Sequence, residues 1–419
     1  MLVTLRDAVV IGAGHNGLVA ANVLADAGFS VAVVEAEDEP GGAVRSGELV
    51  EPGFVNDRFS AFYPLAAASP VFRALGLEIP FRRGPLVLAH PALDGSCAVL
   101  RRDGGDERWR RIEPAVLRGL VTPFPQVRAA LRLAVEPGAV ALLRRPRDPL
   151  DARIREGNAL HADAPPWSPA GRAFGVVLTE LGRHYGFPCV EGGAGRIVDL
   201  LVARALDRGV ELRLGERVDR IPPARRAVVA AIDVWELGRL TGRHRPVVPD
   251  PPALKIDWTL DGPVPWTAEA ARTSPVVHLG GEADFVLFGQ YSMADPSRAP
   301  TGKETAWAYS RALRDAGALE EQVERHAPGF RALVRGRRVE HLEPGRINLG
   351  TARISNELVL RPFNGRPSTG LPNVYLGSAS AHPGGGVHGA PGWIAAQAAV
   401  RSASRRRGRS DASFTISST

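Results

Sequence analysis

The chain has 419 residues, 44% hydrophobic and 23% charged, a composition typical of a globular protein with enough apolar side chains for two packed cores. No apolar run reaches the length of a membrane span and no signal peptide precedes the first predicted strand, so we expect a cytoplasmic protein. The formal net charge is +7, but five arginines and one aspartate lie beyond residue 400. We therefore interpret the charge as the property of a disordered basic tail, residues 401–419, and expect no nucleic-acid partner.

The spacing of the cysteines and histidines argues against three further classes of protein: those with a disulfide framework, a redox-active dithiol or a metal site. Cys97 and Cys189 lie far apart with no CxxC motif, which argues against a disulfide framework and against a redox-active dithiol. The histidines are scattered without the spacing of metal ligands, so we expect no metal site.

The first predicted elements are a strand, a glycine-rich turn and a helix. Residues 9–11 are a β-branched run typical of a strand buried on both faces of a parallel sheet. Gly12 permits a tight turn, Gly14 lets the backbone approach a ligand, and Gly17 lets the next helix pack on the strand. The helix predicted from residue 16 to residue 27 points its N-terminal amides at the turn, which makes a site for a pyrophosphate.

A second buried strand, residues 31–34, ends at Glu35, whose carboxylate is suited to the ribose hydroxyls of an adenosine. The order of strand, turn, helix, strand and acid indicates a dinucleotide site; the alternative is an ordinary strand-to-helix turn. Next, Gly41 and Gly42 allow another close backbone approach, and Arg45 offers a cationic fork.

The rest of the chain contains no second unit of this kind. The glycines of "VEGGAG" follow no Rossmann-type strand, and they precede a predicted amphipathic helix and a strand at residues 210–214. Further strands are predicted at residues 253–260, 275–279 and 285–290. A buried strand at 374–376 leads to a glycine turn at 384–386 and a helix from Pro391. Glycine turns at both ends of the chain suggest that one long ligand contacts both.

These motifs carry a family resemblance. The order of the GxGxxG turn, Glu35, the segment "GGAVR" and "YLGSASAHPGGGVHG" is similar to phytoene-desaturase-like FAD-dependent oxidoreductases, a branch of the amine-oxidase and glutathione-reductase-type flavoproteins. The segments "LKIDWTLDGPVPW", "DPSRAPTGKETAWAY" and "VERHAPGF" also resemble this branch. The resemblance extends to about Arg401.

The resemblance implies an α/β fold: a doubly wound, Rossmann-like FAD-binding domain of the glutathione-reductase type with a discontinuous α+β substrate domain. The expected FAD domain combines residues 1–75, 190–242 and 370–400, and the substrate domain residues 76–189 and 243–369. The cofactor-binding residues that it implies are Gly12, Gly14, His15, Asn16, Gly17, Glu35, Ala36, Gly41, Gly42, Arg45, Val218, Ser378, Gly385, Gly386 and Val387. Val218 is expected on the strand after the second glycine cluster, with its backbone against the adenine.

The implied function is FAD-dependent dehydrogenation or desaturation of an apolar or polyene-like small molecule, with hydride transfer to flavin N5 and oxygen or a quinone as acceptor. An amine or amino-acid oxidase and a non-catalytic binding protein of the same fold remain alternatives. His388 is the candidate proton-handling residue, against a structural role. Trp307, Tyr309 and Trp393 are candidate pocket walls, against plain core positions.

One region departs from the family pattern. Residues 101–170 are short for this part of the family and rich in proline and arginine, with few long apolar helical faces. The resemblance therefore leaves open whether the chain has a substrate lid, whether it associates with a membrane, and whether it is a trimmed relative. The sequence does not predict the oligomeric state.

Overall fold

The computed structural model describes residues 5–59, 61–122, 141–161, 164–244, 249–343 and 366–413. Within these ranges the chain forms a five-stranded sheet, a seven-stranded sheet and two short two-stranded pairs. The described helices include none that is long and apolar enough to cross a membrane.

The five-stranded sheet is parallel throughout, in the order β16-β10-β1-β2-β9. Its strands are β1 (Ala8–Ile11), β2 (Val31–Val34), β9 (Glu211–Arg213), β10 (Ala227–Ala230) and β16 (Val374–Leu376). The strands predicted at residues 9–11, 31–34, 210–214 and 374–376 are confirmed. Because β1 pairs with β2 on one side and with the later strand β10 on the other, the carboxyl end of β1 is the switch point where such sheets bind ligands.

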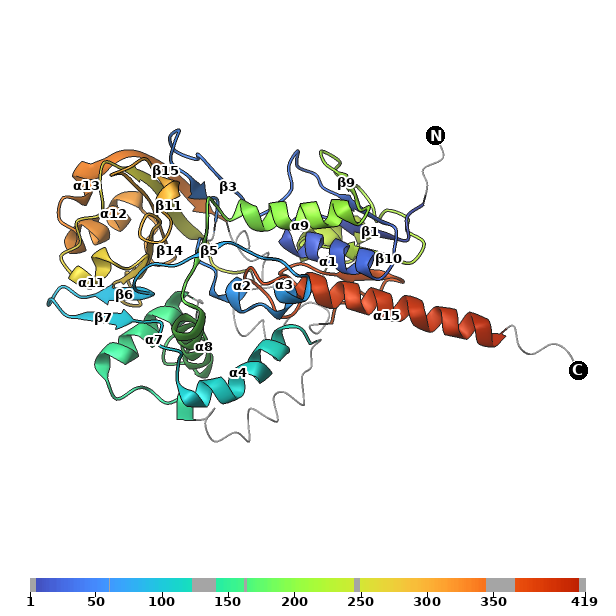
Figure 1. Cartoon of the computed structure of the whole chain (residues 1–419), viewed down its shortest axis with the longest axis horizontal. Helices are drawn as coiled ribbons and strands as arrows, with labels where there is room; N and C mark the ends of the chain where they lie inside the picture. The colour runs from blue at the N-terminus through green and yellow to red at the C-terminus, as the bar shows by residue number, and fades with distance from the viewer. Residues whose placement is uncertain are drawn as a thin grey trace, which may run out of the picture.

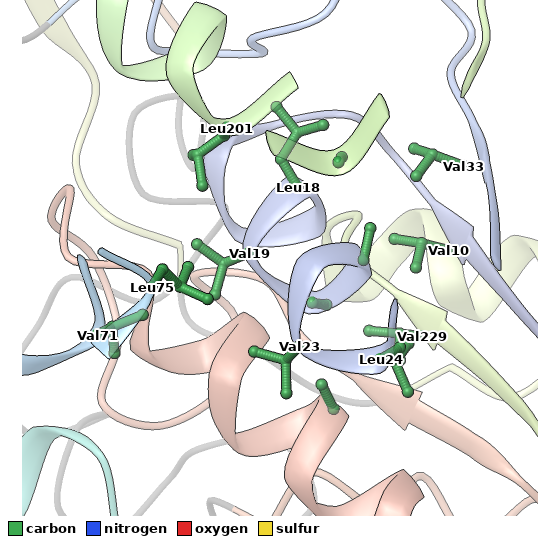
Figure 2. Packing of buried hydrophobic residues seen from close by; sticks show 14 of the residues in the cluster. Val10, Leu18, Val19, Val23, Leu24, Val33, Val71, Leu75, Leu201 and Val229 are labelled. Atoms are coloured by element: carbon green, nitrogen blue, oxygen red, sulfur yellow. The ribbon is translucent and has the colours of Figure 1, made fainter. Parts of the chain in front are cut away.

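The helices that cover this sheet include α1 (His15–Asp26), α9 (Gly195–Asp207) and α15 (Ala390–Ser413). Both α9 and α15 pack on α1, and Figure 1 shows the three together, away from the seven-stranded sheet. Figure 2 shows α1 inserting its side chains between the sheet and α9. The residues of this core labelled there are Val10, Leu18, Val19, Val23, Leu24, Val33, Val71, Leu75, Leu201 and Val229.

The strands of this sheet come from three separate parts of the chain, within the residue ranges expected for the FAD domain. A glycine explains the tight fit between two of the helices. A Cβ on Gly392 of α15 would lie 1.9 Å from the carbonyl oxygen of Asn16, so only glycine lets α15 cross the first turn of α1. The domain boundaries themselves stay a prediction.

The seven-stranded sheet has the order β15-β11-β14-β13-β12-β6-β7 and is antiparallel except between β12 and β6. Its strands are β6 (Leu88–Pro91), β7 (Cys97–Leu100), β11 (Ala253–Leu260), β12 (Val276–Leu279), β13 (Val286–Gln290), β14 (Glu304–Ser310) and β15 (Val334–Leu342). The strands predicted from residue 253 to residue 290 are confirmed to within one residue. An aromatic core lies under this sheet, formed by Trp258, Trp266, Phe288 and Phe330.

The short region after residue 101 is more helical than the sequence indicated. Helices α4 (Glu107–Leu120), α7 (Pro149–His161) and α8 (Pro169–Tyr185) lie there. The expectation of few apolar helical faces does not fit α4, because its Trp109, Ile112 and Leu117 pack into one buried cluster. These side chains are spaced between arginines, so composition alone hides the apolar stripe.

The remaining elements are short. The strands are β3 (Ser46–Gly47), β4 (Asn56–Asp57), β5 (Phe81–Arg82) and β8 (Cys189–Val190). The helices are α2 (Pro64–Ala68), α3 (Pro70–Ala74), α10 (Val234–Thr241), α11 (Glu269–Arg272), α12 (Ala316–His326), α13 (Phe330–Leu333) and the 3-10 turn η1 (Pro296–Arg298).

The C-terminal segment differs from the expected disordered tail. Helix α15 continues to Ser413, and the final residues, 414–419, lie outside the described part. Val400 and Ala403 pack against the core of the five-stranded sheet and carry the helix past residue 400. Alanine and arginine favour helix, which allows the helix to continue beyond that contact.

A buried ionic cluster joins the seven-stranded sheet to the N-terminal segment. Arg298 of η1 is fully buried, and its guanidinium lies 3.2 Å from the Asp57 carboxylate and 3.1 Å from that of Asp295. It also donates to the carbonyl of Val190 at 3.0 Å. Asp57 in turn accepts the backbone N–H of Ala194 just before α9. The cluster therefore fastens β4, β8 and the start of α9 to one side chain.

Candidate functional site

A cavity of about 670 Å³ runs from the carboxyl end of β1 to the inner face of the seven-stranded sheet. This volume is within the range of cofactor and substrate sites. Most of the cofactor residues expected from the sequence lie on its wall: Gly12, Gly14, His15, Asn16, Glu35, Ala36, Gly42, Val218, Ser378, Gly385, Gly386 and Val387.

The three glycines of the first turn have different surroundings. Gly12 has a φ of +97°, and a Cβ there would lie 2.9 Å from the carbonyl oxygen of Ala231. A Cβ on Gly17 would lie 2.0 Å from the carbonyl oxygen of Gly12, so Gly17 serves the packing of α1 on the turn. A Cβ on Gly14 would meet no atom within 4 Å and would stand in the cavity. Gly14 therefore keeps open the space in front of the N-terminus of α1.

The end of β2 supplies the acid of the site. Glu35 is nearly buried, and its two carboxylate oxygens accept the backbone N–H groups of Ala13, at 2.6 Å, and Glu37, at 3.0 Å. These bonds fix the carboxylate beside the glycine turn. No side chain caps the N-terminus of α1, which leaves its first N–H groups for a ligand.

The glycine pair after β2 packs on the same turn. Gly41 bridges to Gly14, and a Cβ on Gly42 would lie 3.4 Å from the Gly14 Cα. Arg45 does not lie on the cavity wall, contrary to its expected place at the phosphates: its guanidinium donates to the carbonyl of Pro40 at 3.2 Å and to that of Glu39. Gly41 leaves room for this side chain, because a Cβ on it would lie 2.9 Å from Arg45 Cγ.

The C-terminal glycine turn closes the cavity opposite the first turn. His15 is hydrogen-bonded to the backbone of Gly386, and burial lowers the pKa of its imidazole to about 4. The neutral ring therefore links the start of α1 to the C-terminal turn, which agrees with a turn-shaping role. Val218 also lines the cavity, but it follows β9 rather than lying on it, because the strand ends at Arg213.

His388 does not lie on the cavity wall. Its Nδ1 accepts the backbone N–H of Ala390 at 3.1 Å, and its Nε2 lies 3.2 Å from the carbonyl oxygen of Gly385. Both ring nitrogens are thus engaged by the backbone of the turn, and the side chain is buried. This geometry favours a structural role for His388 over the proton-handling role considered from the sequence.

We predict that Gly385→Leu keeps part of the FAD affinity but shifts the flavin absorption spectrum and loses turnover, because Gly385 lines the cavity where the flavin ring is expected. His388→Ala should be milder, since it only loosens the turn; loss of a true base costs about 10² to 10⁴-fold where proton transfer limits the rate. Spectra and turnover of both variants test this. An unchanged spectrum and unchanged turnover in Gly385→Leu would place the turn away from the flavin.

The far half of the cavity is walled by aromatic side chains. Trp307 and Tyr309 of β14 lie parallel, with ring centroids 6.3 Å apart, and Phe62 lies 6.3 Å from Trp307. A Cβ on Gly289 would lie 2.3 Å from Trp307 Nε1, so this glycine makes room for the indole. Trp393, on α15, instead packs against the core of the five-stranded sheet. The apolar wall also includes Phe174, Leu178, Phe187, Val276 and Leu287.

The polar residues on this wall that were missed from the sequence include Lys255, His161 and His278. His278 is the single polar residue of the apolar run VVHL, and that interruption was the available signal, whereas Lys255 alternates with Asp257 and Thr259 on its strand. His161 ends α7 and gave no comparable sign. The Lys255 ammonium pairs with the buried Asp257 carboxylate and donates to the carbonyl of Asp57 at 3.3 Å.

The acidic and basic residues of the cavity wall lie at opposite ends of the cavity. Its lining carboxylates, among the described residues, are Glu35, Glu216, Asp233 and Glu236, which all lie near the carboxyl ends of β2, β9 and β10. At the aromatic end the charged lining residues are Lys255 and Arg311. Arg311 lies 3.5 Å from the Asp250 carboxylate and donates to the carbonyl of Pro251 at 2.6 Å. The aromatic end thus offers no carboxylate to a cationic ligand.

The glycine turn, the acid after β2 and the two sheets around one cavity define a nucleotide-binding oxidoreductase fold. The family model "FAD dependent oxidoreductase" matches residues 7–184. The resemblance of the chain to FAD-dependent oxidoreductases of the phytoene-desaturase-like branch is confirmed.

Among curated proteins, a limonene dehydrogenase polypeptide of Castellaniella defragrans is 37% identical over 26% of this chain and 20% of its own length. Hydroxyneurosporene desaturase of Cereibacter sphaeroides is 30% identical over 51% of this chain and 50% of its own. The matched part thus spans between one fifth and one half of these two relatives. The solved structure of cyclohexylamine oxidase from Brevibacterium oxydans covers 97% of this chain with a TM-score of 0.60 and 17% identity, a likeness of fold.

The residues present fit FAD. The open space before Gly14, the uncapped N-terminus of α1 and the carboxylate of Glu35 lie at one end of the cavity, where a pyrophosphate and an adenosine ribose would bind. Gly385, Gly386 and Val387 line the same cavity, where they would contact the flavin. These contacts stay predictions residue by residue. No group of His, Cys, Asp and Glu in the described residues is arranged to hold a metal ion.

Proposed function

We propose that this protein catalyses FAD-dependent dehydrogenation of a C–H bond in an apolar or polyene-like small molecule, as a dehydrogenase or desaturase. The observation that carries the proposal is the aromatic and aliphatic wall at the far end of the cavity, beyond the cofactor turns. The printed functions of the limonene dehydrogenase polypeptide and of hydroxyneurosporene desaturase support the same chemistry.

The flavin, when bound, supplies hydride acceptance at N5. The protein then has to bind, orient and keep water out. Phe62 and the parallel rings of Trp307 and Tyr309 provide a flat apolar wall for an unsaturated chain, and the buried Leu287 extends it. Burial of an apolar ligand against such a wall favours binding by about 25 cal/mol of free energy per Å² of apolar surface removed from water.

A flavin amine oxidase-like reaction is the second candidate, and the paired rings of Trp307 and Tyr309 favour it. The wall opposes it, because no described carboxylate lines it to pair with an ammonium group, and the nearby Asp257 and Asp250 are already paired with Lys255 and Arg311. A trimmed, non-catalytic binder of the same fold, also considered from the sequence, lacks comparable support, because the relatives are enzymes.

The proposal also includes the cellular location of the protein and the electron acceptor of its reduced flavin. The free thiols of Cys97 and Cys189 are compatible with a reducing cytoplasm. Oxygen or a quinone would reoxidise the flavin. We propose no nucleic-acid partner, and we make no proposal on membrane association or on the oligomeric state.

The test is anaerobic reduction of the bound flavin by a panel of unsaturated hydrocarbons, terpenoid alcohols and primary amines, followed by absorbance. The proposal expects bleaching by the hydrocarbon or terpenoid members. Bleaching by amines alone would favour the second candidate and overturn the first.

We also predict that NAD(P)H is not a tightly bound partner, because the described chain has one dinucleotide turn and FAD is expected to fill it. NADPH at micromolar concentration should reduce the flavin slowly or not at all under anaerobic conditions, measured by stopped-flow absorbance. Rapid reduction would contradict this.

A further inference from the structure

Polar side chains gather at one place on the apolar wall. Asn158 and His161 extend from α7, His278 from β12 and Tyr309 from β14, and all four line the cavity. We call this group the polar end of the cavity. Asn158 is already held, since its amide donates to the Thr179 hydroxyl at 2.9 Å. Each of the two histidines stays neutral at physiological pH, because burial lowers the pKa of His161 to about 4 and that of His278 well below its usual value.

The hydrogen bonds of Tyr309 fix the tautomer of His161. The Tyr309 hydroxyl donates to the main-chain carbonyl of His161 at 3.2 Å, and the same oxygen lies 2.7 Å from His161 Nδ1. Of the two neutral tautomers, the one with its proton on Nδ1 satisfies both contacts, because Nδ1–H then donates to the Tyr309 oxygen while the hydroxyl donates to the carbonyl. We assign His161 this tautomer on that ground. Nε2 then bears a lone pair, and within the described residues it has no hydrogen-bond partner. A neutral imidazole held in this way is a fixed hydrogen-bond acceptor on an apolar wall.

The surroundings decide which donor suits this acceptor. Lys255 and Arg311 line the same part of the cavity, but each is already paired with a carboxylate, Asp257 and Asp250 respectively, and no further described carboxylate lines the wall there. An ammonium group would therefore lose its hydration without gaining a counter-ion. A neutral hydroxyl donates one hydrogen bond and carries no charge to desolvate. A pure hydrocarbon leaves the Nε2 lone pair without a partner, which costs binding free energy relative to a ligand that satisfies it.

We propose that His161, held by Tyr309, is a specificity-determining residue that accepts a hydrogen bond from the hydroxyl group of an otherwise apolar substrate. This inference rests on the proposed dehydrogenation of apolar molecules and narrows it to terpenoid or polyene alcohols. His161 and Tyr309 select and orient the substrate; neither is assigned a step in the oxidation.

The experiment compares three probes with one carbon skeleton: geraniol, geranylamine and the hydrocarbon that lacks the polar group. Their dissociation constants are measured with the FAD-loaded protein from the change in flavin absorbance on binding. We expect wild type to bind geraniol about three- to tenfold more tightly than the hydrocarbon, the value of one neutral hydrogen bond. Geranylamine should bind more weakly than geraniol.

The variant His161→Phe keeps a ring of similar size and removes the acceptor. It should bind the hydrocarbon at least as well as wild type and lose the preference for geraniol. Tyr309→Phe should lose part of the preference, because the imidazole is no longer held in one tautomer. The exposed His341, on β15 and outside the cavity wall, gives the control His341→Phe, which should keep the wild-type preference. The flavin spectrum of each variant reports whether it is folded and loaded.

The outcomes separate the inference from the proposed function. If the hydrocarbon and geraniol bind equally to wild type and to His161→Phe, the role of His161 is overturned and the proposed function stands. If geranylamine binds best and the preference survives in His161→Phe, both fail. If none of the probes perturbs the flavin, the interpretation of the aromatic wall as a terpenoid site fails, and the inference fails with it.

Discussion

Gly14→Val is expected to abolish FAD binding while the protein stays folded. A Cβ at position 14 meets no protein atom within 4 Å, so a side chain there begins in open space. It would instead occupy the space before the N-terminus of α1, where a pyrophosphate approaches the backbone amides. The measurement is the FAD content of the purified variant and its dissociation constant on adding FAD back.

Gly281→Val is the matched control. Gly281 also has open space around its Cβ position and no positive φ, but it lies outside the cofactor cavity. This variant should bind FAD as wild type does. A folded Gly14→Val protein with wild-type FAD affinity would mean that the dinucleotide lies elsewhere.

Arg298→Leu is expected to destabilise the protein by about 3–5 kcal/mol, the usual cost of removing one partner from a buried ion pair. The change leaves the fully buried Asp57 carboxylate and that of Asp295 without their cation. It also removes the donor to the Val190 carbonyl. The midpoint of urea denaturation of the FAD-loaded protein measures the loss.

An exposed arginine with two acidic partners provides the comparison. Arg335 pairs with Glu51 at 2.6 Å and with Asp261 at 2.9 Å, but its side chain is accessible to water. Arg335→Leu should change the midpoint little, because solvent screens such pairs. Equal midpoints of urea denaturation for the two variants would show that the buried cluster of Arg298 does not fasten β4, β8 and the start of α9.

The sequence predicts the cofactor half of the molecule well for a physical reason. Residues 9–42 carry their function in backbone geometry, and glycine is the residue that such geometry requires: Gly17 meets the Gly12 carbonyl, and Gly14 faces open space. A local pattern of this kind is readable without the fold. Arg45 shows the limit, since its charge suggested a phosphate contact, whereas its guanidinium closes the local turn at Glu39 and Pro40.

The substrate half could be predicted only in part. Trp307 and Tyr309 were candidate pocket walls and line the cavity, but His161 and His278 belong to α7 and β12, which are distant in sequence and come together only in the folded chain. For His388 the sequence left a proton-handling role and a structural role open. The hydrogen bonds of both ring nitrogens to the backbone of the glycine turn favour the structural role.

The visible absorption spectrum of the purified, desalted protein, with its FAD content determined after denaturation, tests the central claim most directly. The account predicts an oxidised-flavin spectrum and about one FAD per chain in wild type, and neither in Gly14→Val. A folded, colourless wild-type protein that takes up no added FAD would contradict it.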